Sequence, residues 1–239
     1  MNKVNSIWIL GSTSEIAQEI CTQFAKSGCR KFFLIAKDKR KNQKFIENLR
    51  NKYDVQIENQ EVDLLSDYIP RENEYLDYDL YIITAGFLGS NHKKKNLSEE
   101  LNILKINLIS IIPWIKSIVT KERVKKQGCL WIFSSVAGDR GRPSNYQYGA
   151  AKSGLTIYCE GLANIYQKSP FSIRIIKAGL IKTSMVKGNF PDFLFTDKRK
   201  IVSKLRRDPY KNGVEYMPYW WKFIMLIIKS LPSFLMEKL

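Results

Sequence analysis

The sequence predicts an α/β fold: a doubly wound parallel sheet with helices on both faces. Two features of the 239 residues lead to this prediction. Short apolar runs without polar alternation recur along the chain, which is typical of strands buried on both faces. Amphipathic segments with helical periodicity separate these runs, and alternating strands and helices build right-handed βαβ units. Because no Gly/Ser-rich linker and no internal repeat divides the chain, we expect a single domain with a sizeable core.

Each predicted strand is rich in β-branched and aromatic residues. The predicted strands are residues 4–10, 31–36, 78–84, 129–134 and 171–178, with 53–62 as a weaker candidate. The predicted helices are residues 14–27, 97–120 and 146–167, whose apolar residues recur three or four positions apart. Pro113 should kink or break the second helix, because proline removes a helical hydrogen bond. After residue 179 the alternation stops, and residues 184–216 are predicted to be irregular.

Composition narrows the class of protein. Hydrophobic residues make up 44% and charged residues 26%, close to globular averages, which argues against a disordered, collagen-like or multi-span membrane protein. The net charge of +16 favours anionic partners: nucleic acid, phosphate ligands or an acidic membrane surface. His92, the single histidine, lies beside a lysine run, so we expect a surface loop and no metal site. Four scattered cysteines without a CxxC pair indicate buried thiols in a cytoplasmic protein; they are Cys21, Cys29, Cys129 and Cys159.

A glycine-containing turn joins the first predicted strand to the first helix, with the sequence Gly11-Ser12-Thr13-Ser14-Glu15-Ile16. Glycine permits a tight turn, and free N–H groups at the start of a helix can hold a pyrophosphate. The turn is therefore a candidate dinucleotide site. The alternative is an ordinary strand–helix turn with a serine N-cap, since Glu15 and Ala17 stand where a GxGxxG motif has glycines.

The end of the second predicted strand bears on the choice between NAD and NADP. An acidic residue there accepts hydrogen bonds from the ribose of NAD, whereas a basic residue neutralises the extra phosphate of NADP. Lys37 comes first after the strand, with Lys39 and Arg40 close behind, so the sequence favours NADP. Asp38 leaves NAD open, and a solvated basic helix start is the alternative.

Tyr148 and Lys152 form the most informative pair of residues. They lie four positions apart, so they share one face of a helix. A nearby ammonium favours the tyrosinate, so we expect a lowered phenol pKa and a Tyr148 that serves as general acid and base. Ser134 and Ser135 end the preceding strand, at the sheet edge where open α/β folds bind ligands. A hydroxyl there can polarise a carbonyl oxygen.

With these motifs in place, the chain resembles the short-chain dehydrogenase/reductase family over nearly its whole length, which implies a Rossmann-type fold. Tyr148 and Lys152 match the Tyr-x-x-x-Lys motif, and the family serine, thirteen residues earlier, selects Ser135. The remaining matched residues are Asn107 of the long helix, Asp63 toward the adenine, Ala85 and Gly86 after the fourth strand, and Thr183 toward the nicotinamide carboxamide.

The resemblance implies a reductase mechanism. NADPH gives hydride to a carbonyl carbon and Tyr148 protonates the oxygen. Lys152 tunes Tyr148 and binds the nicotinamide ribose, Ser135 holds the substrate oxygen, and Asn107 supports a water relay. The chain departs from the family pattern in having Glu15, Ala17, Thr84 and Ala178 where the family has two glycines, an asparagine and a proline, but the four catalytic positions are intact.

Within the single domain we divide the chain by expected role: residues 1–183 as the cofactor-binding and catalytic core, 184–216 as a variable substrate lid, and 217–239 as an apolar aromatic tail. The basic and aromatic lid suits an anionic substrate with an apolar portion; its alternative is a solvated, charged helix. In the tail, paired tryptophans beside lysines suit the headgroup layer of an acidic membrane. Packing on a partner subunit or on the chain's own sheet is the alternative.

The turn and the tail together are similar to those of reductases of polyprenyl-phosphoryl keto-sugars and related surface-polysaccharide enzymes. This similarity implies an NADP-dependent reductase of a lipid-linked or nucleotide keto-sugar. A soluble reductase of an acyl thioester or another small carbonyl is the first alternative. The second is a nucleic-acid-binding or regulatory protein on the same scaffold, which the intact catalytic set argues against; we therefore expect no nucleic-acid partner. Homo-oligomers are common in the family and are expected here.

Overall fold

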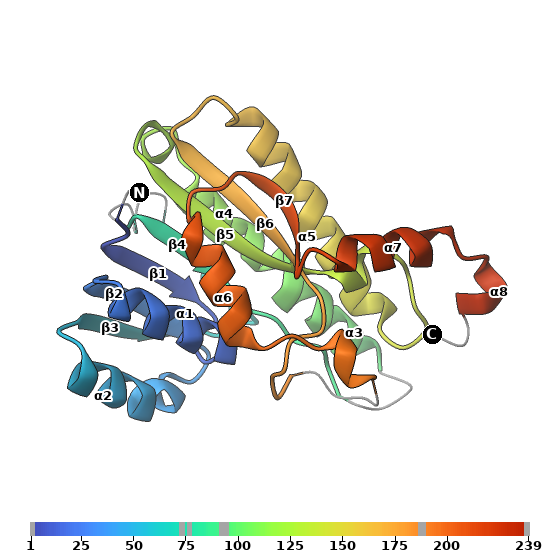
Figure 1. Cartoon of the computed structure of the whole chain (residues 1–239), viewed down its shortest axis with the longest axis horizontal. Coiled ribbons are helices and arrows are strands. Elements are labelled where there is room, and N and C mark those ends of the chain that lie inside the picture. Colours follow the sequence, from blue (N-terminus) through green and yellow to red (C-terminus); the bar gives the residue numbers. More distant parts are fainter. Residues whose placement is uncertain (1–2, 72–74, 76–77, 91–95, 186–189, 237–239) are drawn as a thin grey trace.

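A computed structural model describes residues 3–71, 75, 78–90, 96–185 and 190–236. Seven parallel strands form one sheet in the order β3-β2-β1-β4-β5-β6-β7, with helices on both faces (Figure 1). The predicted fold class is thereby confirmed. His92 lies outside the described residues. The strands are β1 Ser6–Leu10, β2 Lys31–Ala36, β3 Gln56–Glu61, β4 Leu80–Ile83, β5 Gly128–Ser135, β6 Phe171–Ala178 and β7 Gly213–Met217.

Eight α-helices accompany the sheet in the described part of the chain. They are α1 Glu15–Lys26, α2 Gln43–Lys52, α3 Leu97–Leu104, α4 Ile111–Ile118, α5 Tyr146–Ile165, α6 Lys198–Arg207, α7 Trp221–Ser230 and α8 Ser233–Met236. The six strands and the first and third helices predicted from the sequence are confirmed, the weak candidate β3 included, with shifts of a few residues at their ends.

The sheet separates two hydrophobic cores because successive side chains of a strand point to opposite faces. In β1, Ile7 and Ile9 join the core beneath α1, α2 and α6, whereas Trp8 and Leu10 join the core beneath α4 and α5. All four side chains are buried. β1 therefore shows no alternation of apolar and polar residues, and its sequence from Ile7 to Leu10 is a continuous apolar run.

The topology places a crevice at the carboxyl ends of β1 and β4. The chain runs from β1 outward to β2 and β3, then returns to β4 on the other side of β1. Gly11 leaves β1 with a φ of +93°, and a Cβ there would lie 2.4 Å from the backbone nitrogen of Ala85. Only glycine allows this approach, and ligands of open α/β sheets bind at such a reversal point.

The long helix predicted over residues 97–120 is interrupted. A π-helical turn, Lys105–Ile109, separates α3 from α4, and the Ser110 amide donates to the Lys105 carbonyl at 2.9 Å. Pro113 cannot donate to Ile109, so the predicted break exists but lies one turn before the proline. By length and composition Leu97–Ile118 is the one described helical stretch able to cross a membrane, but Trp114 and Ile115 are buried in the core.

The prediction of irregular structure over residues 184–216 was wrong, because this segment contains α6 and β7. Of the ten residues of α6, three are buried apolar side chains, Ile201, Val202 and Leu205, and basic residues dominate the rest. β7 is a short edge strand that pairs with β6 alone. Both patterns are too weak to stand out in a single sequence.

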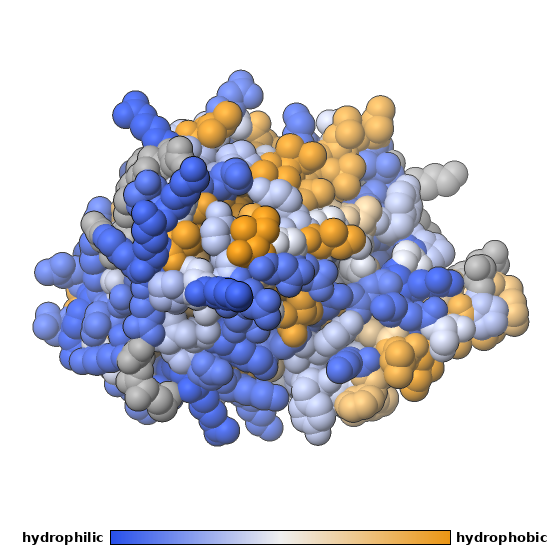
Figure 2. Space-filling view, turned by 90° about the horizontal axis from the view of Figure 1, so that it is seen from above, coloured by the Kyte–Doolittle hydropathy of each residue, from blue (hydrophilic) through white to orange (hydrophobic). Residues whose placement is uncertain are grey.

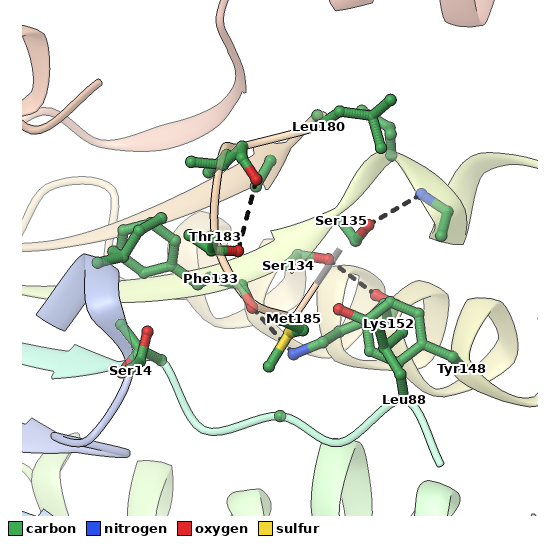
Figure 3. Close-up of a pocket in the computed structure, with 18 of the residues that line it drawn as sticks. Ser14, Leu88, Phe133, Ser134, Ser135, Tyr148, Lys152, Leu180, Thr183 and Met185 are labelled. Atoms are coloured by element: carbon green, nitrogen blue, oxygen red, sulfur yellow. Dashed lines mark hydrogen bonds between the residues drawn. The ribbon is translucent and has the colours of Figure 1, made fainter. Parts of the chain in front are cut away.

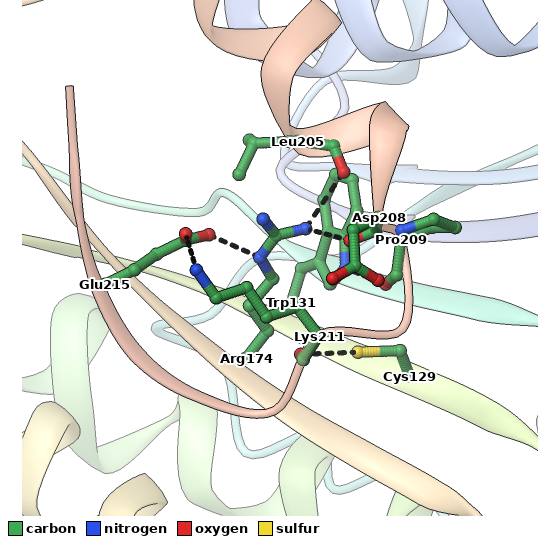
Figure 4. Close-up of polar contacts among 8 residues, drawn as sticks. All are labelled: Cys129, Trp131, Arg174, Leu205, Asp208, Pro209, Lys211 and Glu215. Atoms are coloured by element: carbon green, nitrogen blue, oxygen red, sulfur yellow. Dashed lines mark hydrogen bonds and ion pairs between the residues drawn. The ribbon is translucent and has the colours of Figure 1, made fainter. Parts of the chain in front are cut away.

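Arg174 of β6 fixes this C-terminal part to the sheet (Figure 4). Its side chain is buried; Nε pairs with Glu215 at 2.5 Å, and an Nη atom donates to the carbonyls of Leu205 and Asp208 at 2.9 and 2.8 Å. The guanidinium lies 5.1 Å from the ring centroid of Trp131. One cation thus joins the end of α6, the loop after it and β7.

The tail folds back on the domain as α7 and α8. Trp221 and Met225 of α7 are buried and pack with Val136, which follows β5. The other face of α7 exposes Phe223, Leu226 and Ile227. In Figure 2 the surface seen is largely polar, with apolar groups also present at the end of the molecule that carries α7 and α8.

Candidate active site

A cavity of about 560 Å³ lies at the carboxyl edge of the sheet. It extends from the turn after β1, past β4 and β5, to α7. Figure 3 shows Ser14 on one side of the opening and Tyr148 and Ser135 on the other. The predicted site residues that line it are Gly11, Thr13, Ser14, Glu15, Ile16, Ala85, Gly86, Ser135, Tyr148, Lys152 and Thr183.

The phosphate turn uses part of its own hydrogen-bonding capacity. The amides of Gly11 and Ser12 both donate to the Ile35 carbonyl, at 2.9 and 3.0 Å. The buried Ser12 hydroxyl donates to the same carbonyl and accepts from Asn42, so Ser12 braces the turn and is not among the cavity residues. Ser14 begins α1 without a side-chain cap, which leaves the first N–H groups of the helix for a phosphate.

Glu15, which replaces a family glycine, ties the turn to the C-terminal half of the chain. Its carboxylate accepts from the Ser184 amide at 2.7 Å and pairs with Lys198 at 2.5 Å. These contacts, that of Lys198 above all, lower the pKa of Glu15. The carboxylate stays ionised, but the positive charge of Lys198 compensates its negative charge. The site beside the turn therefore remains compatible with a phosphate.

Asn107 lies outside the cavity and holds in place the segment after β4 that lines it. Its buried amide donates to the carbonyls of Phe87 and Ile103, at 2.7 and 2.8 Å, and accepts from the Phe87 amide at 3.1 Å. A Cβ on Gly86 would lie 3.1 Å from Asn107 Oδ1 and 3.7 Å from Lys152 Nζ. Asn107 thus holds the segment after β4 directly beside Lys152, although it does not line the cavity itself.

Lys37 and Asp63 lie outside the cavity, at the ends of neighbouring strands. Lys37 Nζ pairs with Asp63 at 2.9 Å, and both side chains are substantially exposed. The backbone amide of Leu65 and then Lys37 lower the pKa of Asp63. The sequence assigned these residues to different parts of a dinucleotide, and the structure brings them together at one edge of the sheet.

Tyr148 and Lys152 project from the first two turns of α5 (Figure 3). A Cβ on Gly149 would lie 2.7 Å from the Ala137 carbonyl, so this glycine lets α5 pack closely on the segment after β5. Lys152 Nζ donates to the Phe133 carbonyl at 3.0 Å and lies 5.7 Å from the Tyr148 ring centroid.

The two serines at the end of β5 differ in their surroundings. The Ser134 hydroxyl is buried and bonds with Thr156 at 2.6 Å and with the Lys152 carbonyl at 3.1 Å. Ser135 is partly exposed to the cavity, and its oxygen accepts from the Ala137 amide at 3.1 Å. Ser135 therefore has the hydroxyl that a substrate can reach, as the family spacing implied.

The expected lowering of the Tyr148 pKa is contradicted. Burial raises the pKa of Tyr148 to about 12, and the hydrogen bond with Ser135 offsets this only in part. Burial also lowers the pKa of Lys152 to about 8. The ammonium is held by the Phe133 carbonyl and faces the ring of Tyr148, so desolvation outweighs its attraction for a phenolate.

Comparison with known proteins agrees with this geometry. Residues 5–193 match the family model described as short chain dehydrogenase. The chain belongs to the short-chain dehydrogenase family. Tyr148 and Lys152 both lie within the matched region.

Individual relatives of the family are distant. The chain is 25% identical over 161 residues to an uncharacterised oxidoreductase of Mycobacterium tuberculosis, covering 66% of this chain and 64% of that protein. It is 31% identical over 110 residues to a 3-oxoacyl-[acyl-carrier-protein] reductase of Buchnera aphidicola, covering 46% and 45%. A short-chain dehydrogenase from Sphingobium yanoikuyae, solved with NADPH, superposes with a TM-score of 0.78 at 17% identity, covering 96% and 97%.

Several residues that line the cavity were not predicted from the sequence. Arg142 and Asn145, on the loop before α5, line the cavity, as do Trp221, Ile224 and Ile228 of α7. Their only signal was position: Arg142 lies six residues before Tyr148. No periodicity shows that a loop arginine faces inward or that a C-terminal helix folds over a site.

Proposed function

We propose that this chain reduces a ketone to an alcohol with NADPH. The observation that carries this proposal is that Ser135, Tyr148 and Lys152 line the same cavity as an uncapped helix start suited to a phosphate. The fit of a dinucleotide rests on this helix start and on the close backbone packing at Gly11. Gly11, Thr13, Ser14 and Ile16 are proposed to hold its phosphates, with Ala85, Gly86, Lys152 and Thr183 toward the nicotinamide.

When bound, the nicotinamide supplies the hydride. The Ser135 hydroxyl donates a hydrogen bond to the carbonyl oxygen, and Tyr148 transfers its proton to that oxygen. Because burial raises the Tyr148 pKa to about 12, the phenol is protonated at neutral pH and is available as an acid. Lys152, with a pKa of about 8, is cationic at neutral pH and can return a proton to the phenolate. Asn107 is proposed as a positioning residue that keeps the segment after β4 beside Lys152.

We assign the preference for NADP to Lys37, with Asp63 directed at the adenine. Lys37→Gln is expected to raise the Kd for NADPH about tenfold and to leave that for NADH unchanged, because an exposed cation contributes modestly to phosphate binding. Nucleotide fluorescence measures both constants, and Lys41→Gln, an exposed lysine nearby, is the control. Equal wild-type affinities for the two cofactors would contradict the assignment, and failure to oxidise NADPH with any member of a broad ketone panel would contradict the reductase.

For the substrate we propose a lipid-linked or nucleotide keto-sugar, reduced at the face of an acidic membrane. Apolar side chains of α7, Ile224 and Ile228, line the cavity, whereas its outer face exposes Phe223, Leu226 and Ile227 beside two exposed lysines. Residues 216–236 contain no acidic side chain. A short helix of this kind suits the headgroup layer, and the segment 184–216 before it is proposed to form part of the substrate lid.

Vesicle co-sedimentation tests the membrane proposal. The wild-type chain is expected to sediment with anionic vesicles and to be released by high salt, because attraction to anionic headgroups is screened. Leu226→Glu should weaken sedimentation several-fold, whereas Ile69→Glu should not; both residues are 69% exposed. Equal sedimentation of the two variants would rule out α7 as the contact and favour a soluble reductase, such as one acting on an acyl thioester.

A further inference from the structure

The end of the cavity beyond Tyr148 contains polar atoms without partners. Among the described residues, six buried side-chain nitrogen and oxygen atoms make no hydrogen bond, and three of them, Arg142 Nε, Asn145 Oδ1 and Trp221 Nε1, belong to residues that line this cavity. Buried polar groups are nearly always paired in native proteins, and an exception calls for a missing partner. The three atoms lie in one cavity, where the polar groups of a bound ligand can pair with them.

Arg142 has no carboxylate partner in the described part of the chain. Asp139, the carboxylate whose charge acts on Arg142, already pairs with Lys177 at 2.6 Å and accepts from the Tyr216 hydroxyl at 2.6 Å. Within the described part of the chain, the Arg142 side chain donates to the thioether of Met225, at 3.9 Å. Burial lowers the pKa of the guanidinium, although arginine stays charged in the working pH range. A half-buried cation without an anion is costly, so this end of the cavity favours a negative group.

The position of Arg142 separates it from the cofactor's phosphates. The phosphate turn lies on the side of the cavity that Ser14 marks in Figure 3, across from Tyr148. Asn145 is the N-cap residue of α5, three positions or about 4.5 Å before Tyr148, and its backbone amide donates to the Arg142 carbonyl at 3.2 Å. An anion at Arg142 would therefore belong to the substrate, close to the carbonyl that Tyr148 protonates.

We propose that the substrate is an anionic, amphiphilic ketone whose carboxylate or phosphate binds the Arg142 guanidinium. Its apolar portion lies against Leu180, Leu194 and Ile228, which line the cavity and pack against the cluster formed by Val136, Trp221 and Met225. A guanidinium suits both kinds of anion, because its parallel N–H groups match two oxygens at once. This inference rests on the proposed ketone reduction and names the substrate class for it.

Matched ketones test the proposal in the whole chain with NADPH: a long-chain keto acid, its methyl ester, and a keto-alkyl phosphate of equal length. Arg142→Met is expected to lower kcat/KM for the two anions by roughly 10- to 100-fold, the loss that corresponds to a hydrogen bond with a charged group. The kcat/KM for the ester, which has no negative charge, should fall several times less. Arg140→Met is the control, because Arg140 donates to the Leu231 carbonyl and does not line the cavity. Comparison of the two anions shows whether carboxylate or phosphate is preferred.

Calorimetry with the NADPH complex measures anion binding directly, so this second test does not depend on turnover of a ketone. Inorganic phosphate and a saturated fatty acid are titrated into the wild type, Arg142→Met and Arg142→Lys; we expect binding of at least one anion, its loss in the first variant and partial recovery in the second. Equal kcat/KM for acid and ester, or anion binding that is unchanged in Arg142→Met, would overturn the anion site. Reduction of no ketone by the wild type, with anion binding still dependent on Arg142, would overturn the reductase and leave the site standing.

Discussion

Replacing Tyr148 by phenylalanine is expected to lower kcat for ketone reduction by roughly 10³-fold, the size of a general-acid contribution. The phenol is the group in the cavity that can supply a proton to the carbonyl oxygen, since its pKa is raised to about 12 and it stays protonated at neutral pH. The variant keeps the ring that packs beside Lys152, so NADPH binding should be retained. Stopped-flow NADPH oxidation measures the rate, and nucleotide fluorescence measures binding.

Tyr146 provides a matched control for this substitution. It lies two residues earlier, is exposed, and its hydroxyl donates to Glu100 at 2.8 Å. Tyr146→Phe removes a hydroxyl from the same helix without touching the cavity, so its rate should stay near that of the wild type. A Tyr148→Phe enzyme with an unchanged rate would show that the proton comes from elsewhere.

Replacing Arg174 by alanine should destabilise the fold by about 3–5 kcal/mol, because it leaves the largely buried Glu215 without its main cation. Burial alone raises the pKa of Glu215, but Arg174 and Lys211 outweigh it and hold that pKa below the usual range. The variant also loses hydrogen bonds to the ends of α6 and the loop after it. Urea unfolding followed by circular dichroism gives the change in free energy.

Two further variants locate the origin of that loss. Arg207→Ala removes an exposed cation of α6 and should change stability by less than about 0.5 kcal/mol. Arg174→Met with Glu215→Leu removes both charges and should recover much of the lost stability, because an apolar pair avoids the cost of desolvation. If Arg174→Ala were no less stable than Arg207→Ala, the buried pair would not fix β7 to the sheet.

The sequence allowed the central sheet to be predicted because parallel strands buried on both faces read as continuous apolar runs. β7 and α6 could not be predicted, because β7 pairs on one side only and α6 has three buried residues among many lysines and arginines. From the sequence, Pro113 predicts only that one helical hydrogen bond is lost. It does not predict that the helix changes to a π-helical turn at Lys105–Ile109, before the proline.

In the candidate site, too, some features could be predicted from the sequence and others could not. The spacing of Tyr148 and Lys152, together with the family resemblance that selected Ser135, was enough to predict that these three residues share a site, and all three line one cavity because α5 and the end of β5 meet there. It was not enough to show that Ser12 turns inward to Ile35, nor that desolvation outweighs Lys152 in setting the Tyr148 pKa. Both depend on the surroundings of a group in three dimensions. Arg142 was missed for the same reason.

A crystal structure of the chain with NADPH would show directly whether Tyr148 and Ser135 act on a carbonyl beside the nicotinamide. We expect C4 of the nicotinamide to face the hydroxyls of Tyr148 and Ser135, with both within hydrogen-bond reach, about 3 Å, of a point where one carbonyl oxygen fits. Lys152 should contact the ribose, and the pyrophosphate should lie at the start of α1. A nicotinamide bound away from Tyr148, or a Tyr148 hydroxyl directed out of the cavity, would contradict it.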